Sequence, residues 1–140
     1  MTPQEKKALL LRVVTKLAAQ QLENGGLTPF GATLGSKREV QLLVPDRIKP
    51  DATLEELDAY WTRELRQAAA KGDCDTVCTC IHVGMQTEEG ISVPALLIHI
   101  EQADAFSEDI LYPYEKGEGS EVVFSEPTTE AAEYQIFVPS

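Results

Sequence analysis

The sequence predicts an α+β fold in which two amphipathic helices cover one face of a mainly antiparallel sheet of five to seven strands. Three observations predict it. Two segments carry apolar residues at helical spacing, and each begins with a capping box. Alternating apolar residues elsewhere mark strands, and turn residues separate these strands. The expected order is α-β-β-α-β-β-β-β, within a single domain that covers residues 1–140.

The first helix is expected to begin at Thr2, because Thr2 and Glu5 form a capping box around a proline at the first helical position. Its apolar stripe comprises Leu10, Val13, Val14 and Leu17. Gly25 and Gly26 are expected to end the helix, since glycine readily adopts the left-handed conformation found at helix C-termini.

Two short strands are expected at residues 30–34 and 40–44, with a turn at 35–38 that makes them a hairpin. Pro45 should end the second strand, because proline cannot donate a hydrogen bond to a ladder. A second capping box, Thr53-Leu54-Glu55-Glu56, predicts the start of the second helix, and Lys71-Gly72 its end. The apolar stripe of this helix comprises Leu54, Leu57, Trp61, Leu65 and Ala68.

The rest of the chain is rich in residues that favour strands. Residues 76–86 and 91–102 are expected to form a hairpin across a turn at 87–90. From Ala95 onward the second of these strands is apolar on both faces, which is typical of a central strand. Shorter strands are expected at residues 108–114, 121–125 and 133–138.

The order of helix, hairpin, helix and three-strand meander resembles the profilin-like and roadblock-type regulatory folds over most of residues 1–115. This resemblance is one of topology, without a shared motif. The stretch 28–34, together with Tyr112-Pro113-Tyr114, also resembles small, uncharacterised bacterial α+β proteins. That second resemblance implies no activity.

Negative charge is concentrated in the C-terminal part of the chain. The whole chain has 12 basic and 23 acidic residues, a net charge of −11. Residues 101–140 carry ten of the acidic residues and one basic residue, Lys116. Such a surface repels nucleic acid and anionic membranes but attracts a basic protein. No apolar run approaches the length of a membrane span and no signal peptide is expected, so a cytoplasmic location is predicted.

These acidic residues are interspersed with aromatic ones. Acidic side chains around tyrosines are typical of a protein interface, although the same acids can simply confer solubility. The predicted partner-binding residues are Tyr112, Tyr114, Glu108, Asp109, Glu115, Glu118 and Glu121. The leading prediction is a non-enzymatic binding or regulatory module for a basic partner, inhibitor- or immunity-like by analogy of charge and size. If both helices cover one face, the other face would also suit a homodimer.

The alternative interpretation is a zinc- or thiol-dependent protein. Cys78, Cys80 and His82 alternate along one strand and so share a face. If partner numbers in the hairpin sum to 177, Cys78 lies opposite His99, and the four side chains form a zinc-type ligand set. The competing interpretation is that the cysteines fill the core, with no metal and no other cofactor. Cys74 lies between two aspartates that disfavour its thiolate.

The sequence nominates no catalytic residues. It contains no nucleophile elbow, no phosphate-binding loop and no dinucleotide-binding glycine pattern. A third hypothesis is a small-molecule site between a helix and the sheet, for which no residue set stands out.

Overall fold

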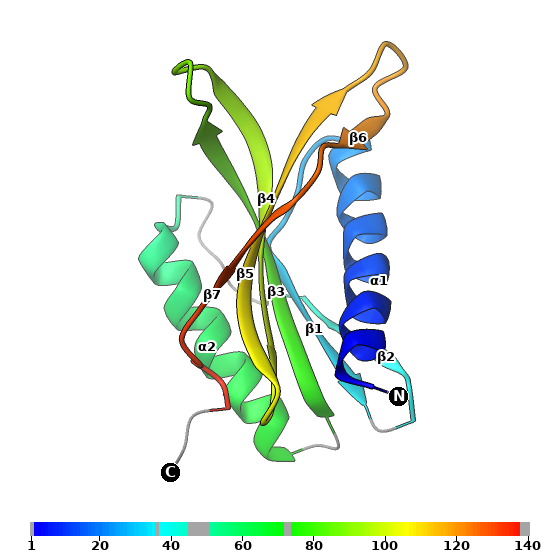
Figure 1. Cartoon of the computed structure of the whole chain (residues 1–140), viewed down its shortest axis with the longest axis vertical. Coiled ribbons are helices and arrows are strands. Elements are labelled where there is room, and N and C mark those ends of the chain that lie inside the picture. The colour runs from blue at the N-terminus through cyan, green and yellow to red at the C-terminus, as the bar shows by residue number, and fades with distance from the viewer. Residues whose placement is uncertain (1, 36, 45–50, 72–73, 138–140) are drawn as a thin grey trace.

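The computed structural model describes residues 2–35, 37–44, 51–71 and 74–137, and it shows a seven-stranded antiparallel sheet with two helices (Figure 1). The helices are α1 (Pro3–Glu23) and α2 (Leu54–Lys71). The strands are β1 (Phe30–Gly35), β2 (Val40–Leu43), β3 (Cys74–Gln86), β4 (Ser92–Gln102), β5 (Phe106–Lys116), β6 (Val122–Phe124) and β7 (Thr128–Ala131). Their order in the sheet is β2-β1-β3-β4-β5-β6, and β7 also pairs with β5. The predicted α+β class with a mainly antiparallel sheet is confirmed.

Both helices begin where their capping boxes predict. The Thr2 hydroxyl accepts a hydrogen bond from the Glu5 backbone at 3.1 Å, and the Thr53 hydroxyl accepts one from Glu56 at 3.1 Å. The predicted ends at Pro45 and Gly72 lie outside the described residues. No helix in the described part of the chain is long and apolar enough to cross a membrane.

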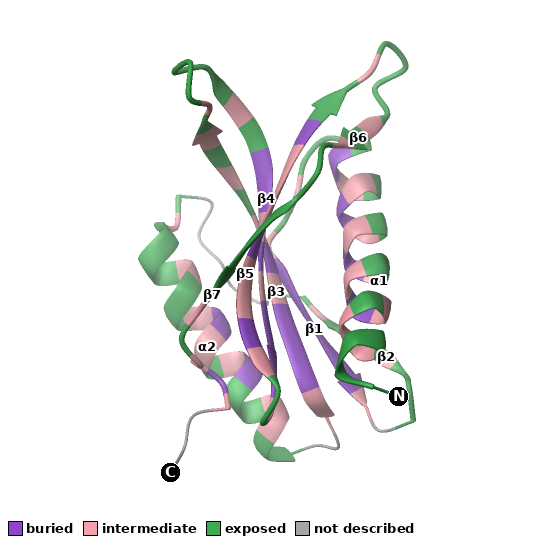
Figure 2. Cartoon of the chain, in the orientation of Figure 1, coloured by how far each residue is buried: buried purple, intermediate pink, exposed green. Residues whose placement is uncertain are grey.

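The two helices cover opposite faces of the sheet, so the prediction that both lie on one face is wrong. The apolar side of α1 packs against Cys78 and Cys80 of β3, whereas Leu65 of α2 packs against Val77. Val77 and Cys78 are consecutive, and consecutive strand residues point to opposite faces. The physical reason is that the central strands are apolar on both sides, and each side requires cover. Figure 2 shows the buried residues of the sheet lying between the two helices.

The helix α2 lies very close to β1. A Cβ atom added at Gly31 would lie 3.0 Å from the ring of Trp61, which is itself 3% exposed. Glycine at this position therefore allows the indole ring to rest directly on the backbone of β1.

The β3–β4 register differs by one residue from the expected one. Thr79 pairs with His99 and Cys78 with Ile100, so partner numbers sum to 178 rather than 177. The turn explains the shift. The Thr87 backbone donates to the carbonyl of Ile91 at 2.9 Å, which closes a three-residue loop. Gly90 has a φ of 81°, as such loops require.

The sheet divides near its middle, at the end of the β4–β5 ladder. The pairing of β4 with β5 ends at Ala95 and Pro113, while β3–β4 continues to Gln86 and Ser92. Beyond Pro113, β5 pairs with β6 instead. The Ser125 backbone donates to the carbonyl of Pro113 at 2.8 Å, so the backbone groups of Pro113 face away from β4. Pro94, the next residue of β4, has no N–H to donate toward β5, so the ladder ends there and two hairpins diverge (Figure 1).

The C-terminal strand lies earlier in the chain than predicted. The sequence predicts a strand over residues 133–138, whereas β7 spans Thr128–Ala131 and residues 132–137 form no strand. Val138 lies outside the described residues. The backbone N–H groups of Gln135, Ile136 and Phe137 bond to the side chain of Glu101 instead of a neighbouring strand.

Candidate functional site

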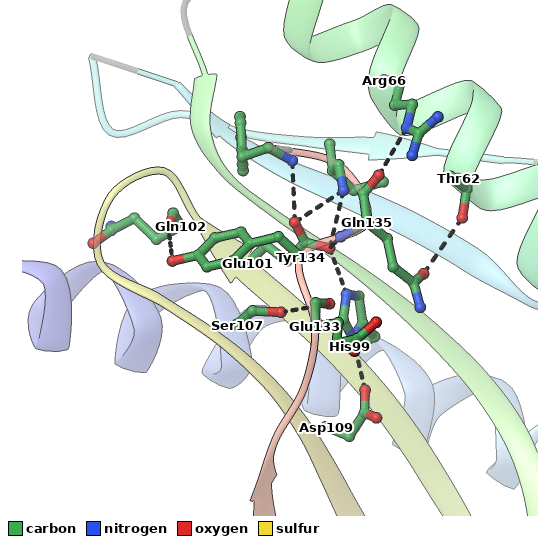
Figure 3. A network of polar contacts seen from close by, with 12 residues as sticks. Thr62, Arg66, His99, Glu101, Gln102, Ser107, Asp109, Glu133, Tyr134 and Gln135 are labelled. Carbon is green, nitrogen blue, oxygen red and sulfur yellow. Dashed lines mark hydrogen bonds and ion pairs between the residues drawn. The ribbon is translucent and has the colours of Figure 1, made fainter. Parts of the chain in front are cut away.

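The carboxylate of Glu101, near the end of β4, has four hydrogen-bond donors around it (Figure 3). This side chain faces α2 and is 0% exposed. It accepts hydrogen bonds from the backbone N–H groups of Gln135 at 2.8 Å, Ile136 at 2.9 Å and Phe137 at 3.1 Å. Burial alone would raise the pKa of Glu101, but these bonds and one from His99 together lower it.

His99 lies between two carboxylates. Its Nε2 donates to Glu101 at 2.6 Å and its Nδ1 donates to Asp109 at 2.7 Å. Both acceptors are carboxylate oxygens, so the ring carries a proton on each nitrogen and is an imidazolium. Burial lowers the pKa of His99, but the two neighbouring carboxylates outweigh that effect and raise it. With both nitrogens engaged, this histidine holds the structure together and has no free nitrogen for acid–base chemistry.

Further bonds tie the segment of residues 132–137 to α2 and to the sheet. The Arg66 guanidinium donates to the carbonyl of Gln135 at 2.7 Å. On the other side, the Ser107 hydroxyl donates to the carbonyl of Glu133 at 3.1 Å, and Tyr134 donates to the carbonyl of Gln102 at 3.2 Å. The segment therefore closes over Glu101 and bridges α2 to the central strands.

We expect the free energy of unfolding to be greatest between about pH 4.5 and pH 6.5. The raised pKa of His99 gives stability that is fully present below its ordinary value of 6.5 and is lost as pH rises through the folded value. The lowered pKa of Glu101 gives stability that is present above 4.5 and is lost as pH falls through the folded value. Urea unfolding at a series of pH values measures the free energy of unfolding on both sides of this range. In His99→Gln the decline above pH 6.5 should disappear, and a profile identical to that of the wild type would contradict this assignment.

A small cavity of about 120 Å³ lies beside this network, between α2 and the sheet. Its apolar lining comes from Leu57, Trp61, Leu65, Ile81, Leu97 and Ile136. Its polar lining includes His99 and Asp109. The cavity lies between a helix and the sheet, where the small-molecule hypothesis placed a site.

The tyrosines of the predicted partner site do not form exposed anchors. Tyr114 is 6% exposed, and its hydroxyl lies 2.8 Å from Nε2 of His82. Tyr112 is half-buried against the same core, with its ring edge-on to Phe124. Burial raises the pKa of both tyrosines. Position 112 and position 114 do share a face, as predicted, but that face is covered by α1.

The acidic residues of the predicted site divide between three places. Glu108 forms an ion pair with Lys7 on the α1 side. Asp109 faces the α2 side and bonds to His99. Glu115, Glu118 and Glu121 are exposed on the hairpin that joins β5 and β6. The expectation of one surface formed by all seven residues is therefore wrong, because consecutive residues of β5 point to opposite faces.

A narrower acidic surface follows the outer strands of the sheet, and we name it the acidic edge. It consists of six exposed carboxylates: Glu115, Glu118, Glu121, Glu126, Glu130 and Glu133. Lys116 is the one basic residue between positions 101 and 140. All four residues of β7 are exposed.

The zinc-type ligand set does not come together. Cys78, Cys80 and His82 lie on the face covered by α1, whereas His99 lies on the face covered by α2. Burial raises the pKa of Cys80 to about 12 and also raises that of Cys78, so both thiols are protonated core residues. Among the residues that the structure describes, no three histidine, cysteine or acidic side chains are grouped so that they could hold a metal ion.

The sequence analysis missed two features of this site, which are the burial of Glu101 and the backbone N–H groups that donate to it. Glu101 was counted with the surface acids, although it directly follows the apolar run that ends at Ile100. Its position directly after a buried apolar run was the available signal that this carboxylate is itself buried. Its donors lie more than thirty positions later in the chain and leave no local pattern.

Comparison of the chain with protein-family models, with curated proteins and with solved structures finds no match. The resemblances in element order therefore stay predictions. The structure shows an α+β fold with an antiparallel sheet, in which the network around Glu101 holds the segment of residues 132–137 on the α2 side.

Proposed function

We propose that this chain is a non-enzymatic protein-binding module whose acidic edge contacts a basic partner. The observation that carries the proposal is the set of six exposed carboxylates along β5, β6 and β7, with Lys116 as the one base among them. A surface of one sign accelerates the encounter with an oppositely charged protein and disfavours partners of like charge.

The backbone of β7 supports the same proposal. The Ala132 backbone donates to the carbonyl of Ser107 at 2.9 Å, which fixes the direction of pairing with β5. Because this direction alternates along a strand, the backbone groups of Thr129 and Ala131 point away from β5. In the described part of the chain, β7 pairs with no other strand. An extended basic segment could therefore add to this edge through main-chain hydrogen bonds.

Binding is favoured over catalysis because three side chains suited to acid–base or nucleophilic chemistry are already hydrogen-bonded or buried. Both nitrogens of His99 are bonded to carboxylates. The thiols of Cys78 and Cys80 are buried, and their raised pKa keeps them protonated.

The test uses a synthetic oligolysine peptide and two matched double variants. We expect Glu126→Gln with Glu130→Gln to weaken binding at low salt by about threefold to tenfold, since exposed ion pairs contribute about 0.2–1 kcal/mol each. Glu88→Gln with Glu89→Gln removes the same charge from the exposed β3–β4 turn and should change affinity less. Isothermal titration between about 0.05 and 0.5 M salt measures the affinities.

Affinity should fall steeply as salt rises, because screening acts on exposed charges. Equal losses in the two double variants would show that only net charge matters and would reject the acidic edge as a site. Affinity that does not change with salt would reject the proposal as a whole.

A further inference from the structure

Near the middle of the sheet, the α2 side is less fully covered than the α1 side, although Ala95 on the α2 side is buried. On the α1 side, Cys80, Leu96 and Ile98 are each 0% exposed. Their neighbours on the α2 side, such as Ile81 and Leu97, are only half-buried. Figure 2 shows that α2 lies beside the lower half of the sheet, below the point where the two hairpins diverge.

Apolar side chains from three strands lie together on this partly covered half. Ile81 of β3 pairs with Leu97 of β4, which pairs with Leu111 of β5. One pleat further on, Val83 and Pro113 lie on either side of Ala95. We name this surface the apolar platform: Ile81, Val83, Leu97, Leu111 and Pro113. All five are half-buried.

The platform leads into the cavity under α2. Ile81 and Leu97 belong to the platform and also line the cavity of about 120 Å³. Leu57 lines it from α2, and Leu54, one turn earlier on the same side of the helix, is 59% exposed. An apolar cavity of about 150 Å³ can hold benzene, so this one has room for one aliphatic side chain.

Carboxylates surround the platform. Asp109 and Glu115 flank Leu111 and Pro113 on the same face of β5, because alternate strand residues share a face. Glu130 of β7 pairs directly with Asp109, whose side chain is 45% exposed. Exposed Asp58 contributes a further carboxylate from α2. The platform is thus an apolar surface with an acidic rim.

We propose that the apolar platform docks a basic amphipathic helix of a partner protein, with one apolar side chain in the cavity beside α2. This inference rests on the proposed function and adds a contact by a helix of the partner to the pairing of an extended segment with β7. Three strands span about 10 Å, which is also about the diameter of a helix with its side chains. A docked helix would lie next to α2 in the same layer. Its lysines and arginines would meet Asp58, Asp109 and Glu130. A second copy of this chain is disfavoured, since it would bring a net charge of −11 against the same rim.

The test compares two synthetic peptides of the same composition. One is a lysine–leucine peptide of about 14 residues, roughly four turns, with leucines at helical spacing. The other has the same residues in an order without that spacing. We expect the first peptide to bind at least about tenfold more tightly, because only it presents an apolar stripe together with basic flanks.

Two matched variants locate the binding surface. Val83→Lys places a cation on the platform, and we expect it to weaken binding of the amphipathic peptide about tenfold. Val44→Lys makes the same change at a residue beyond β2 that is 73% exposed, and it should leave the affinity close to that of the wild type. Methyl NMR of the unaltered chain gives a second readout. The signals of Ile81, Leu97 and Leu111 should shift on titration, and that of Val44 should not.

Each outcome decides a separate point. If both peptides bind equally and with strong salt dependence, the docked helix is rejected while the acidic edge stands. If neither peptide binds at low salt, both proposals fail. Methyl shifts confined to residues outside the platform would overturn the inference even if Val83→Lys does not fold. A dimer in light scattering that the peptide dissociates would assign the platform to a second copy and would also overturn it.

Discussion

Replacing Glu101 by glutamine should destabilise the protein by about 3–5 kcal/mol, the cost of breaking a buried charge pair on one side. The substitution preserves the shape of the side chain but removes the negative charge that faces His99 and three backbone N–H groups. The glutamine amide would also direct a donor toward groups that are themselves donors. Chemical unfolding at pH 6 to 7 measures the loss, within the range in which both groups are expected to be charged.

The matched control for this substitution is Glu133→Gln, which makes the same change at an exposed residue of the same segment. It should change the stability by less than about 0.5 kcal/mol. Hydrogen exchange adds a local measurement, since the amides of Gln135, Ile136 and Phe137 should exchange faster in Glu101→Gln. Unchanged protection at these three amides would contradict the role assigned to Glu101.

Truncating Leu65 to alanine should destabilise the protein by about 2–5 kcal/mol, as is usual when a buried leucine leaves a cavity. Leu65 is 0% exposed and packs with Val77 and Ile136 in the smaller of the two cores. This core attaches α2 and the segment of residues 132–137 to the sheet. Thermal and chemical unfolding measure the loss.

The matched control is Leu54→Ala on the same helix, where the leucine is 59% exposed. Its effect should stay within about 0.5 kcal/mol, because little apolar surface returns to water. If the two variants were equally stable, α2 would not depend on the smaller core for its attachment. That result would also remove the support for a cavity between α2 and the sheet.

Local signals in the sequence predicted the elements well. The capping boxes at Thr2 and Thr53 mark the helix starts because a side-chain acceptor for free N–H groups is a local requirement. Alternating apolar residues and turns marked the first hairpin and the long strands in the same way. These signals act over a few residues, so they can be read without knowledge of the tertiary structure.

The arrangement of the elements depends on contacts between distant residues and was predicted less well. The apolar residues on both faces of β4 indicate that both sides of the sheet require cover, yet the sequence analysis predicts both helices on one side. The β3–β4 register depends on the turn that contains Gly90. The observed register differs from the expected one by one position, so His99 does not lie opposite Cys78. The environment of Glu101 depends on residues 34 to 36 positions away, which no periodicity reveals.

The separation between Glu101 and its donors has a consequence for synthesis on the ribosome. The carboxylate belongs to a central strand, whereas the three N–H groups that satisfy it are translated 34 to 36 residues later. Until those residues emerge, burying β4 beneath α2 would leave the Glu101 carboxylate with His99 as a donor but without the three N–H groups, which costs free energy. Completion of this half of the sheet therefore requires residues 135–137 to have been synthesised, and it includes the closure of a long loop.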